Sequence, residues 1–333
     1  MESATVQQFF FQHLKERLPS HVSLVDDIAD LLNISNDSAY RRIRGEKPII
    51  FEELQKLCTH YKVSLDQFLH LQSDAIMFSG RINSASPTRF EDYLGSLLKL
   101  LQSVNSFKSK HLYFLMKDIP PIVHFQIPEL ASFKFYFWMK SILDDQRLKH
   151  LKFSFDEPLY QQFHFVSRKV IEEYNKIPVT EIWNIESINS TLRQIDFYRQ
   201  SGSYTKTSDI RLLYDKVEEL VNHIERQAEL GVKFNLGETP SANAASYRLF
   251  VNELILGDNT FVTEMDGIRT TFLNHSVLYF VGTKDEQFNN DMFGNMEILM
   301  KKSTLISTVG EKERVRFFNR LRDKIHHMRS SLK

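Results

Sequence analysis

Apolar residues recur at helical spacing along the first 75 residues of the chain, and short polar turns divide them into five segments. The first segment has its apolar face at Val6, Phe9, Phe10, Leu14 and Leu18. Ser23, Ser35 and Ser64 stand where helix N-caps are expected, and Gly45 stands where a helix should end. We therefore expect one compact unit of five short helices, at 6–18, 24–32, 35–44, 51–61 and 64–69.

The remainder of the chain begins with a linker-like stretch and then alternates between helical and β-type patterns. Residues 79–88, SGRINSASPT, have the composition of a linker. Helical spacing predicts helices at 90–104, 129–143, 159–174, 185–198, 210–231, 285–302 and 311–329. Strands are expected at 111–119, 247–256, 260–265, 268–272 and 277–281, and Asp266-Gly267 is typical of a hairpin turn.

These patterns predict a mainly α protein with two domains, as its length of 333 residues also suggests. The first domain is the five-helix unit, residues 1–75, and a linker follows at 76–89. The second domain, residues 90–333, is expected to be mostly helical and to contain a small antiparallel β-meander near 247–281.

Three features of the second domain allow two interpretations each. Apolar residues repeat at spacings of three and four over residues 210–224, and we call this series, Ile210, Leu213, Val217, Leu220 and Ile224, the ladder. It spans little more than two heptads, which favours a helix of an intrachain bundle over a dimer coiled coil. Core packing is favoured over a ligand pocket for an aromatic group made up of Tyr113, Phe114, Phe125, Phe133, Phe135, Phe137 and Trp138. Residues 311–333 carry a net charge of +5, which is typical of a solvated face and less so of an auxiliary DNA contact.

Composition and charge narrow the class of protein. The first 18 residues are charged and carry no cleavage site, and no apolar run approaches the roughly 20 residues of a membrane span, so we expect no signal peptide and no membrane. The only cysteine, Cys58, excludes an intrachain disulfide and is expected to pack in a core. A cytoplasmic location is expected.

Motifs that carry catalysis are absent from the sequence. It holds no phosphate-binding loop, no Gly-rich dinucleotide turn, no His-Glu-x-x-His and no Gly-x-Ser-x-Gly. Its 12 histidines have no metal-ligand spacing. We therefore expect no catalytic residues, no metal and no cofactor, and we do not expect an enzyme.

Charge is concentrated at one place in the first domain. The formal net charge of the chain is zero and that of residues 1–75 is −3, yet residues 38–47 carry +3, from Arg41, Arg42, Arg44 and Lys47 against Glu46. Affinity for nucleic acid depends on charge at the contact surface. The local excess of cations lies on the third predicted helix.

The string from Leu24 to Leu69 resembles the helix-turn-helix family of phage-repressor type (Cro/Xre-like), over about residues 22–70. The features shared with it include Ala29 and Asn33 in the second helix and turn, and Gly45 after the third helix. The run 40–46 also resembles, more weakly, the N-terminal module of BetR-type regulators. The resemblance implies a repressor-like transcriptional regulator that reads double-stranded DNA with the N-terminal side chains of its third helix in the major groove.

Carried over by position, the family's base-reading residues are Asn36, Asp37 and Arg41. The full set of expected DNA contacts is Asn36, Asp37, Ser38, Tyr40, Arg41, Arg42, Arg44 and Lys47. The sequence departs from the family at Arg42, where an apolar residue or Trp is usual, so the third helix could be rotated by about one residue. Arg44, beside Gly45, is expected to contact phosphate.

The second domain needs a task of its own, which we expect to be dimerisation, the sensing of a small-molecule or protein effector, or both. Two other functions remain open. One is a protein-interaction scaffold with a degenerate helix-turn-helix, and the other is an enzyme whose active site lies in the second domain.

Overall fold

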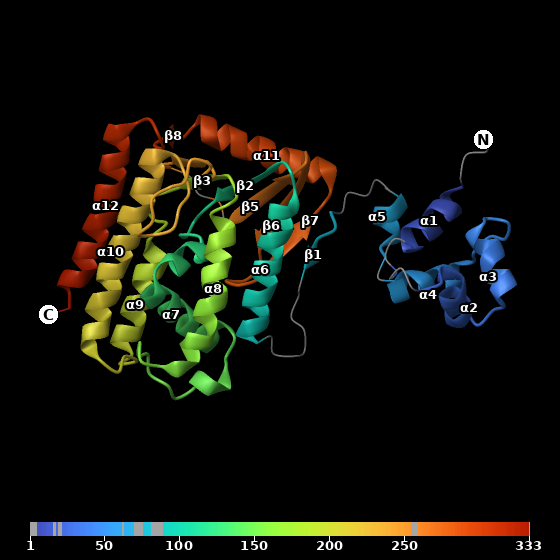
Figure 1. Ribbon diagram of the computed structural model, residues 1–333, viewed down its shortest axis with the longest axis horizontal. Helices are drawn as coiled ribbons and strands as arrows, with labels where there is room; N and C mark the ends of the chain where they lie inside the picture. Colours follow the sequence, from blue (N-terminus) through green and yellow to red (C-terminus); the bar gives the residue numbers. More distant parts are fainter. Residues whose placement is uncertain are drawn as a thin grey trace. The chain divides into compact units, whose positions relative to one another are not determined.

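The computed structural model describes residues 5–15, 18, 22–61, 63–69, 76–80, 89–254, 257 and 259–332. The chain divides into two compact units, Met1–Met77 and Phe78–Lys333 (Figure 1). The expected linker, 76–89, differs from what the structure shows, because Ser79–Gly80 form strand β1 of the second unit. Residues 81–88 of that linker lie outside the described residues.

The first unit holds the five predicted helices, α1 (Val6–Lys15), α2 (Leu24–Leu32), α3 (Asn36–Ile43), α4 (Phe51–Tyr61) and α5 (Leu65–Leu69). Their core includes Phe10, Leu14, Ile28, Ala39 and Leu57, and half-buried Cys58 packs against it as expected. Burial raises the pKa of the Cys58 thiol.

The apolar face expected for α1 was wrong in part. Val6 and Phe9 are more than half exposed, whereas Phe11 is buried with Phe10 and Leu14. The helix is turned in this way because its glutamines face the loop after α3, as described below.

A mixed sheet of eight strands lies at the centre of the second unit, in the order β1-β7-β6-β5-β2-β3-β4-β8. The strands other than β1 are β2 (Lys110–Leu115), β3 (Val179–Trp183), β4 (Tyr247–Val251), β5 (Thr260–Met265), β6 (Ile268–Asn274), β7 (Phe280–Thr283) and β8 (Thr304–Leu305). β3 runs parallel to both β2 and β4, and the remaining neighbours are antiparallel.

The expectation of a mainly α chain with a small meander is therefore corrected to a mixed α/β architecture. The meander exists as β5-β6-β7, and Asp266 and Gly267 both adopt positive φ in its first turn, as predicted. However, β4 is separated from the meander by β2 and β3. The strand β3 was not predicted, because all five of its residues are buried and Glu181 interrupts its apolar run. A parallel strand covered on both faces shows no alternation of polar and apolar residues.

Helices cover both faces of this sheet. One face shares the large core with α6 (Phe90–Ser106), α7 (Pro128–Phe137), α8 (Gln161–Tyr174), α9 (Asn189–Gln200), α10 (Thr207–Leu230) and α12 (Glu311–Ser330). The other face packs against α11 (Glu286–Lys301) (Figure 1). A π-helical turn, η2 (Trp138–Ile142), extends α7. The short elements η1 (Pro121–Gln126), η3 (Gln146–Leu148) and η4 (Pro158–Tyr160) are 3-10 helices.

The interpretation of α10 as a helix of an intrachain bundle is confirmed. The five ladder residues from Ile210 to Ile224 are all buried within the chain, and α10 packs against α7, α9, α12 and β4. The ladder is therefore not exposed as the seam of a dimer coiled coil.

Most members of the predicted aromatic group also lie in the core, as favoured. Two of them, Phe114 and Trp138, line a cavity that is described below.

Candidate nucleic-acid interface

A tight turn joins α2 to α3 and determines which side of α3 is exposed. Asn33 ends α2 in the left-handed conformation, with φ of 54°, and Ile34 N donates to Ala29 O at 3.0 Å. Asparagine tolerates this conformation better than most residues. Ser35 then caps α3 by accepting from Ser38 N at 3.2 Å, and buried Ala29 and Ala39 belong to the core shared by the two helices. The two helices are thus joined by three residues.

The outer side of α3 and the loop after it carry most of the expected DNA contacts. Asn36, Asp37, Tyr40, Arg41, Arg44 and Lys47 are all exposed. The Arg44 guanidinium lies 5.5 Å from the centre of the Tyr40 ring. Glu46 lies between two of the cations, 3.9 Å from Arg41 Nε and 3.5 Å from Arg44 Nε. These pairs are exposed, so they are weak and leave both guanidinium groups accessible to another anion.

Asn36 is held by a residue of the preceding helix. Its side-chain Nδ2 donates to Asp26 Oδ1 at 2.8 Å. One N–H group of the amide is therefore engaged, and its carbonyl oxygen has no part in this bond. Asp37, the neighbouring residue, adds a negative charge to the same end of α3.

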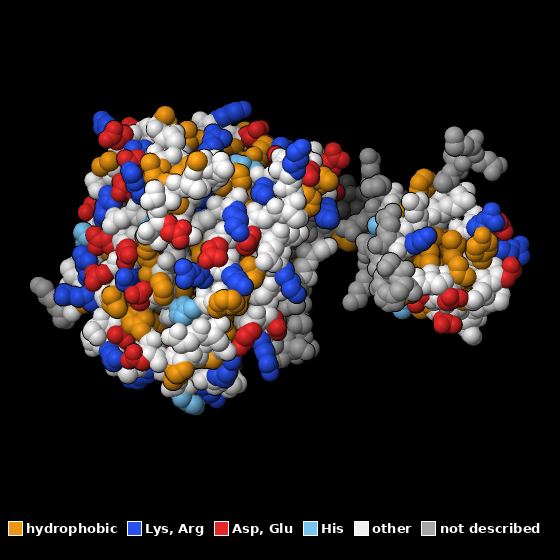
Figure 2. All heavy atoms as spheres, viewed as in Figure 1, with side chains coloured by type: hydrophobic (Ala, Val, Ile, Leu, Met, Phe, Trp, Pro, Cys, Tyr) orange, Lys and Arg blue, Asp and Glu red, His pale blue; other side chains and the backbone are white. Residues whose placement is uncertain are grey.

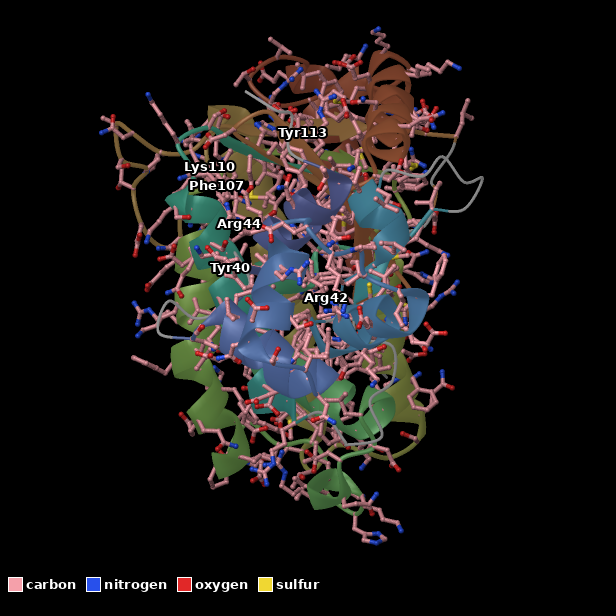
Figure 3. All side chains as sticks on the ribbon, turned by 90° about the vertical axis from the view of Figure 1, so that its right-hand side faces the viewer. Tyr40, Arg42, Arg44, Phe107, Lys110 and Tyr113 are labelled. Atoms are coloured by element: carbon pink, nitrogen blue, oxygen red, sulfur yellow. The ribbon has the colours of Figure 1, made fainter. Side chains whose placement is uncertain are left out.

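Arg42 points inward, which corrects its assignment as a DNA contact. Only 6% of its side chain is exposed, and it forms a bidentate pair with Glu53 of α4, with N–O distances of 2.9 and 2.6 Å. Its remaining Nη1 donates to the backbone and side-chain oxygens of Ser38. The hydrogen bonds from Arg42 lower the pKa of the Glu53 carboxyl. In Figure 3, Tyr40 and Arg44 lie together, and Arg42 lies apart from them.

This arrangement also settles the register of α3. Position 42, where the sequence predicted either an apolar residue or a rotated helix, is buried and is occupied by a paired arginine. The helix is therefore not rotated to expose Arg42. Ser38 is half-buried and is committed to Arg42, so it is a supporting residue of the pair.

Two glutamines of α1, which the sequence did not single out, hold the loop after α3. Gln7 Nε2 donates to Arg42 O and to Lys47 O, both at 2.7 Å, and its Oε1 accepts from Ile49 N. Gln8 Nε2 donates to Arg44 O at 2.8 Å. These bonds fix carbonyl groups at the end of α3 and in the loop after it, and Arg42 O also accepts from Gly45 N at 3.0 Å. The only sequence signal was a pair of polar residues beside an otherwise aromatic face.

The surface around α3 is mixed in character. With Arg42 neutralised by Glu53, the exposed cations are Arg41, Arg44 and Lys47. The first unit also exposes large apolar side chains, including Val6, Phe9, Ile50 and Phe51, of which Phe51 is 84% exposed. Figure 2 shows hydrophobic side chains gathered on the face of this unit that it displays, with charged side chains beside them.

The basic C-terminal helix α12 is for the most part a paired surface. Arg322 lies 2.6 Å from Glu225, Lys324 lies 2.9 Å from Glu186, and Arg329 lies 2.6 Å from Asp215. Arg314 is buried and donates to the carbonyl groups of Ile306 and Val309. The carboxylates of neighbouring elements thus neutralise much of the local excess of positive charge.

The described part of the chain holds neither a cluster of metal ligands nor a membrane-spanning helix. None of its His, Cys, Asp and Glu side chains form a group of three that could hold a metal ion. No helix within the described ranges has both the length and the apolar character needed to cross a bilayer. No protein-family model, no curated protein and no solved structure matches the chain.

Proposed function

We propose that the chain is a sequence-specific transcriptional regulator that reads double-stranded DNA with α3. One observation carries this proposal. A three-residue turn leads into α3, which is capped by Ser35, and the outer side of α3 and its C-cap present Asn36, Tyr40, Arg41 and Arg44. Such a helix fits the major groove of B-DNA, with its N-terminal side chains at the base edges.

Each exposed side chain suits a different contact. A guanidinium such as that of Arg41 bonds the O6 and N7 of guanine in two places, and a side-chain amide such as that of Asn36 bonds adenine. Arg44 and Lys47, at the far end of α3 and in its loop, suit phosphate groups. Asp37 suits the amino group of cytosine, since it would repel phosphate.

Binding of the full-length protein to its preferred duplex is expected to weaken steeply with salt, because Lys and Arg contacts with phosphate release counterions.

The variant Arg41→Ala should lose roughly 1–3 kcal/mol of binding free energy on that duplex and should relax the base preference at one position. Arg44→Ala should instead weaken binding to all sequences alike and lower the salt slope by about one. Selection from a random duplex library, followed by titration at several salt concentrations, measures both effects.

A matched control is Arg168→Ala, which removes an arginine whose side chain is 78% exposed on α8 of the second unit. This variant should bind as the unaltered protein does. Absence of salt-sensitive binding to any genomic fragment would refute the proposal that the protein is a transcription factor.

We expect the regulator to act as a homodimer. Helix-turn-helix modules read two half-sites about 34–36 Å apart through a two-fold axis. The short helices of the first unit are occupied with their own core, so the second unit is expected to provide the dimer contact. Light scattering of the protein, free and on DNA, measures the mass, and a monomer in both states would contradict this expectation.

A second candidate function is protein binding by the first unit. The exposed side chains of Ile50 and Phe51 favour it, because aromatic and aliphatic groups of this size are enriched at protein contacts. If the full-length protein binds a protein partner and does not bind duplex DNA, that result would support protein binding as the function of the first unit in place of DNA reading.

A further inference from the structure

The second unit holds a partly open cavity of about 630 Å³ beside the sheet. Much of its wall is apolar, with Leu97 and Leu100 from α6, Phe114 from β2 and Trp138 at the end of α7. Cavities of this size hold ligands as large as a drug molecule, and a few polar groups in an apolar wall usually orient them.

One end of the cavity holds a buried ammonium group. Lys134 lies in the middle of α7, with buried Phe133 and Phe135 as its sequence neighbours, and only 5% of the residue is exposed. Its Nζ donates to Thr191 Oγ1 at 2.9 Å and to Gln194 Oε1 at 2.7 Å. Both partners are neutral, and no carboxylate among the described residues forms an ion pair with it.

The other polar groups at this end form no ion pair with the ammonium, and the charge of Asp118 compensates it only in part. His124 Nε2 lies 3.0 Å from Thr191 Oγ1, and burial lowers the pKa of His124 well below 6.5, so its ring is neutral. Asp118, which also lines the cavity, accepts hydrogen bonds from the Ser190 hydroxyl and from Asn259 Nδ2. Its oxygens are thus already engaged by neutral groups.

A further polar atom of the wall lacks a partner. Thr263 on β5 lines the cavity and is 2% exposed, and its Oγ1 makes no hydrogen bond with any described residue. A buried hydroxyl without a hydrogen-bond partner is destabilising, because it has lost its hydration. A ligand with a polar atom near this strand would supply the missing bond.

We propose that this cavity binds an amphipathic organic carboxylate, whose anionic group pairs with Lys134 and whose apolar body lies against α6. A buried cation with neutral partners is destabilised by the loss of its hydration, and a desolvated anion beside it offsets that loss. The third N–H group of Lys134 supplies a charge-assisted hydrogen bond. This inference does not depend on DNA reading by the first unit.

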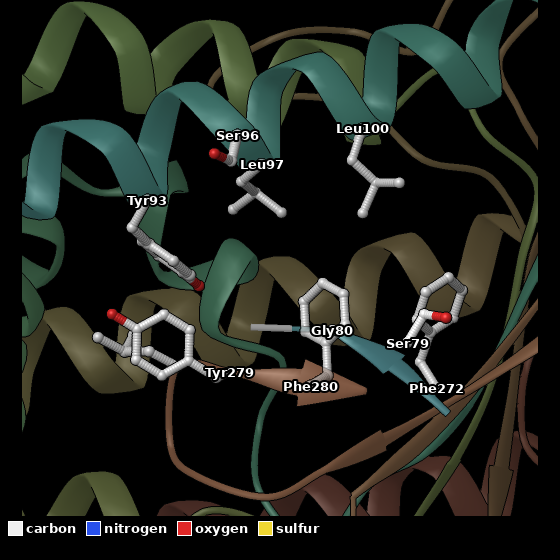
Figure 4. Close-up of a pocket in the computed structure, with 10 residues that line it drawn as sticks. Ser79, Gly80, Tyr93, Ser96, Leu97, Leu100, Phe272, Tyr279 and Phe280 are labelled. Atoms are coloured by element: carbon white, nitrogen blue, oxygen red, sulfur yellow. The ribbon is translucent and has the colours of Figure 1, made fainter. Parts of the chain in front are cut away.

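A smaller cavity of about 240 Å³ shares part of this wall. Tyr93, Leu97 and Leu100 of α6 line both cavities, as does Phe280 of β7, and β1 lines the smaller one. Figure 4 shows these α6 side chains facing Gly80 and Phe280. An apolar body that displaces the α6 side chains would therefore also affect the contacts of β1.

The test is isothermal titration of the full-length protein with decanoate and with phenylbutyrate, each compared with its primary amide. The carboxylates are expected to bind at least about tenfold more tightly than the amides, since hydrogen bonds to charged groups are the stronger ones. In Lys134→Met the preference for carboxylate should disappear. In the control Lys140→Met, whose Nζ donates to Leu151 O and does not line the cavity, it should remain.

Folding of each variant is checked by circular dichroism. If Lys134→Met does not fold, the variant Leu100→Trp tests the proposal instead. Its indole ring would fill the apolar end of the cavity and should abolish binding of both carboxylates. Three results would overturn the proposal: no binding by either carboxylate, equal binding by the amides, or unchanged binding by Leu100→Trp.

The same titration has an expected pH dependence. Burial lowers the pKa of the Lys134 ammonium to about 7, and the charge of Asp118 acts in the opposite direction. The ammonium form binds the anion, so the affinity should be constant between about pH 6, where the ligand carboxyl is still ionised, and about pH 7. Above that it should fall up to about tenfold per pH unit. The other titratable groups lining the cavity include Lys117, Asp118, His124 and His275. Burial holds the pKa of His124 well below 6.5, so its ring does not take up a proton in this range. Affinity that stays constant from pH 7 to 9 would contradict pairing with Lys134.

Discussion

Arg42→Ala is expected to destabilise the first unit by about 3–5 kcal/mol, because it leaves the partly buried carboxylate of Glu53 without its partner. Ser38 loses its contact with the guanidinium at the same time. A loss of this size is a large part of the stability of a small domain. Hydrogen exchange of peptides from 24–61, measured in the full-length protein, should become much faster.

Two comparisons separate this structural role from a role in DNA contact. Arg41→Ala removes an exposed guanidinium and should leave the exchange unchanged. The double variant Arg42→Met with Glu53→Leu replaces the pair with apolar groups and should recover most of the stability. Unchanged exchange in Arg42→Ala together with loss of DNA sequence preference would contradict the buried pair.

The pair also gives the first unit an acid-sensitive stability. The pKa of Glu53 in the folded protein lies below its usual value of 4.5, chiefly because of the hydrogen bonds from Arg42. The folded state therefore holds fewer protons than the unfolded state between the two values. The stabilisation by this group is present above pH 4.5 and is lost as the pH falls through the folded-state pKa.

Glu181→Ala is expected to destabilise the second unit by about 3–5 kcal/mol. The carboxylate of Glu181 lies in the central strand β3 and is 1% exposed. It accepts hydrogen bonds from Tyr174 Oη at 2.8 Å, Trp183 Nε1 at 2.8 Å and Tyr247 Oη at 2.9 Å. Its loss leaves three buried donors without a partner, and the buried ammonium of Lys233 nearby loses a compensating charge.

Urea denaturation followed by tryptophan fluorescence measures this effect. Both tryptophans, Trp138 and Trp183, belong to the second unit, so the signal reports that unit alone. Glu181→Gln keeps one acceptor oxygen and should lose less stability than Glu181→Ala. A denaturation midpoint of Glu181→Ala equal to that of the unaltered protein would show that these hydrogen bonds contribute no net stability.

The sequence by itself determined the local structure of the first unit. Ser23 and Ser35 cap their helices, and Asn33 ends α2 in the left-handed conformation, because caps and turns depend on residues only a few positions apart. The Asp266-Gly267 hairpin was predicted for the same reason. The helical period of the α10 ladder correctly placed one face of that helix in a core.

Tertiary structure alone decided where the charged groups face. Arg42 was assigned to the DNA surface because it belongs to the cluster of cations on the third predicted helix. Only the position of Glu53, eleven residues later on α4, provides its partner. The roles of Gln7 and Gln8 depend in the same way on the loop that α1 meets about 40 residues later.

The local sequence pattern likewise could not predict the full sheet or the cavity of the second unit. β3 is paired with strands at 110–115 and 247–251, and its burial on both faces removes the alternation by which a strand is recognised. Lys134 stands in the sequence as one polar residue in an aromatic run, and only the approach of α9 supplies Thr191 and Gln194 to it. Capping and turn formation depend on neighbours in the chain, whereas the pairing of buried charges depends on groups that only the folded chain brings together.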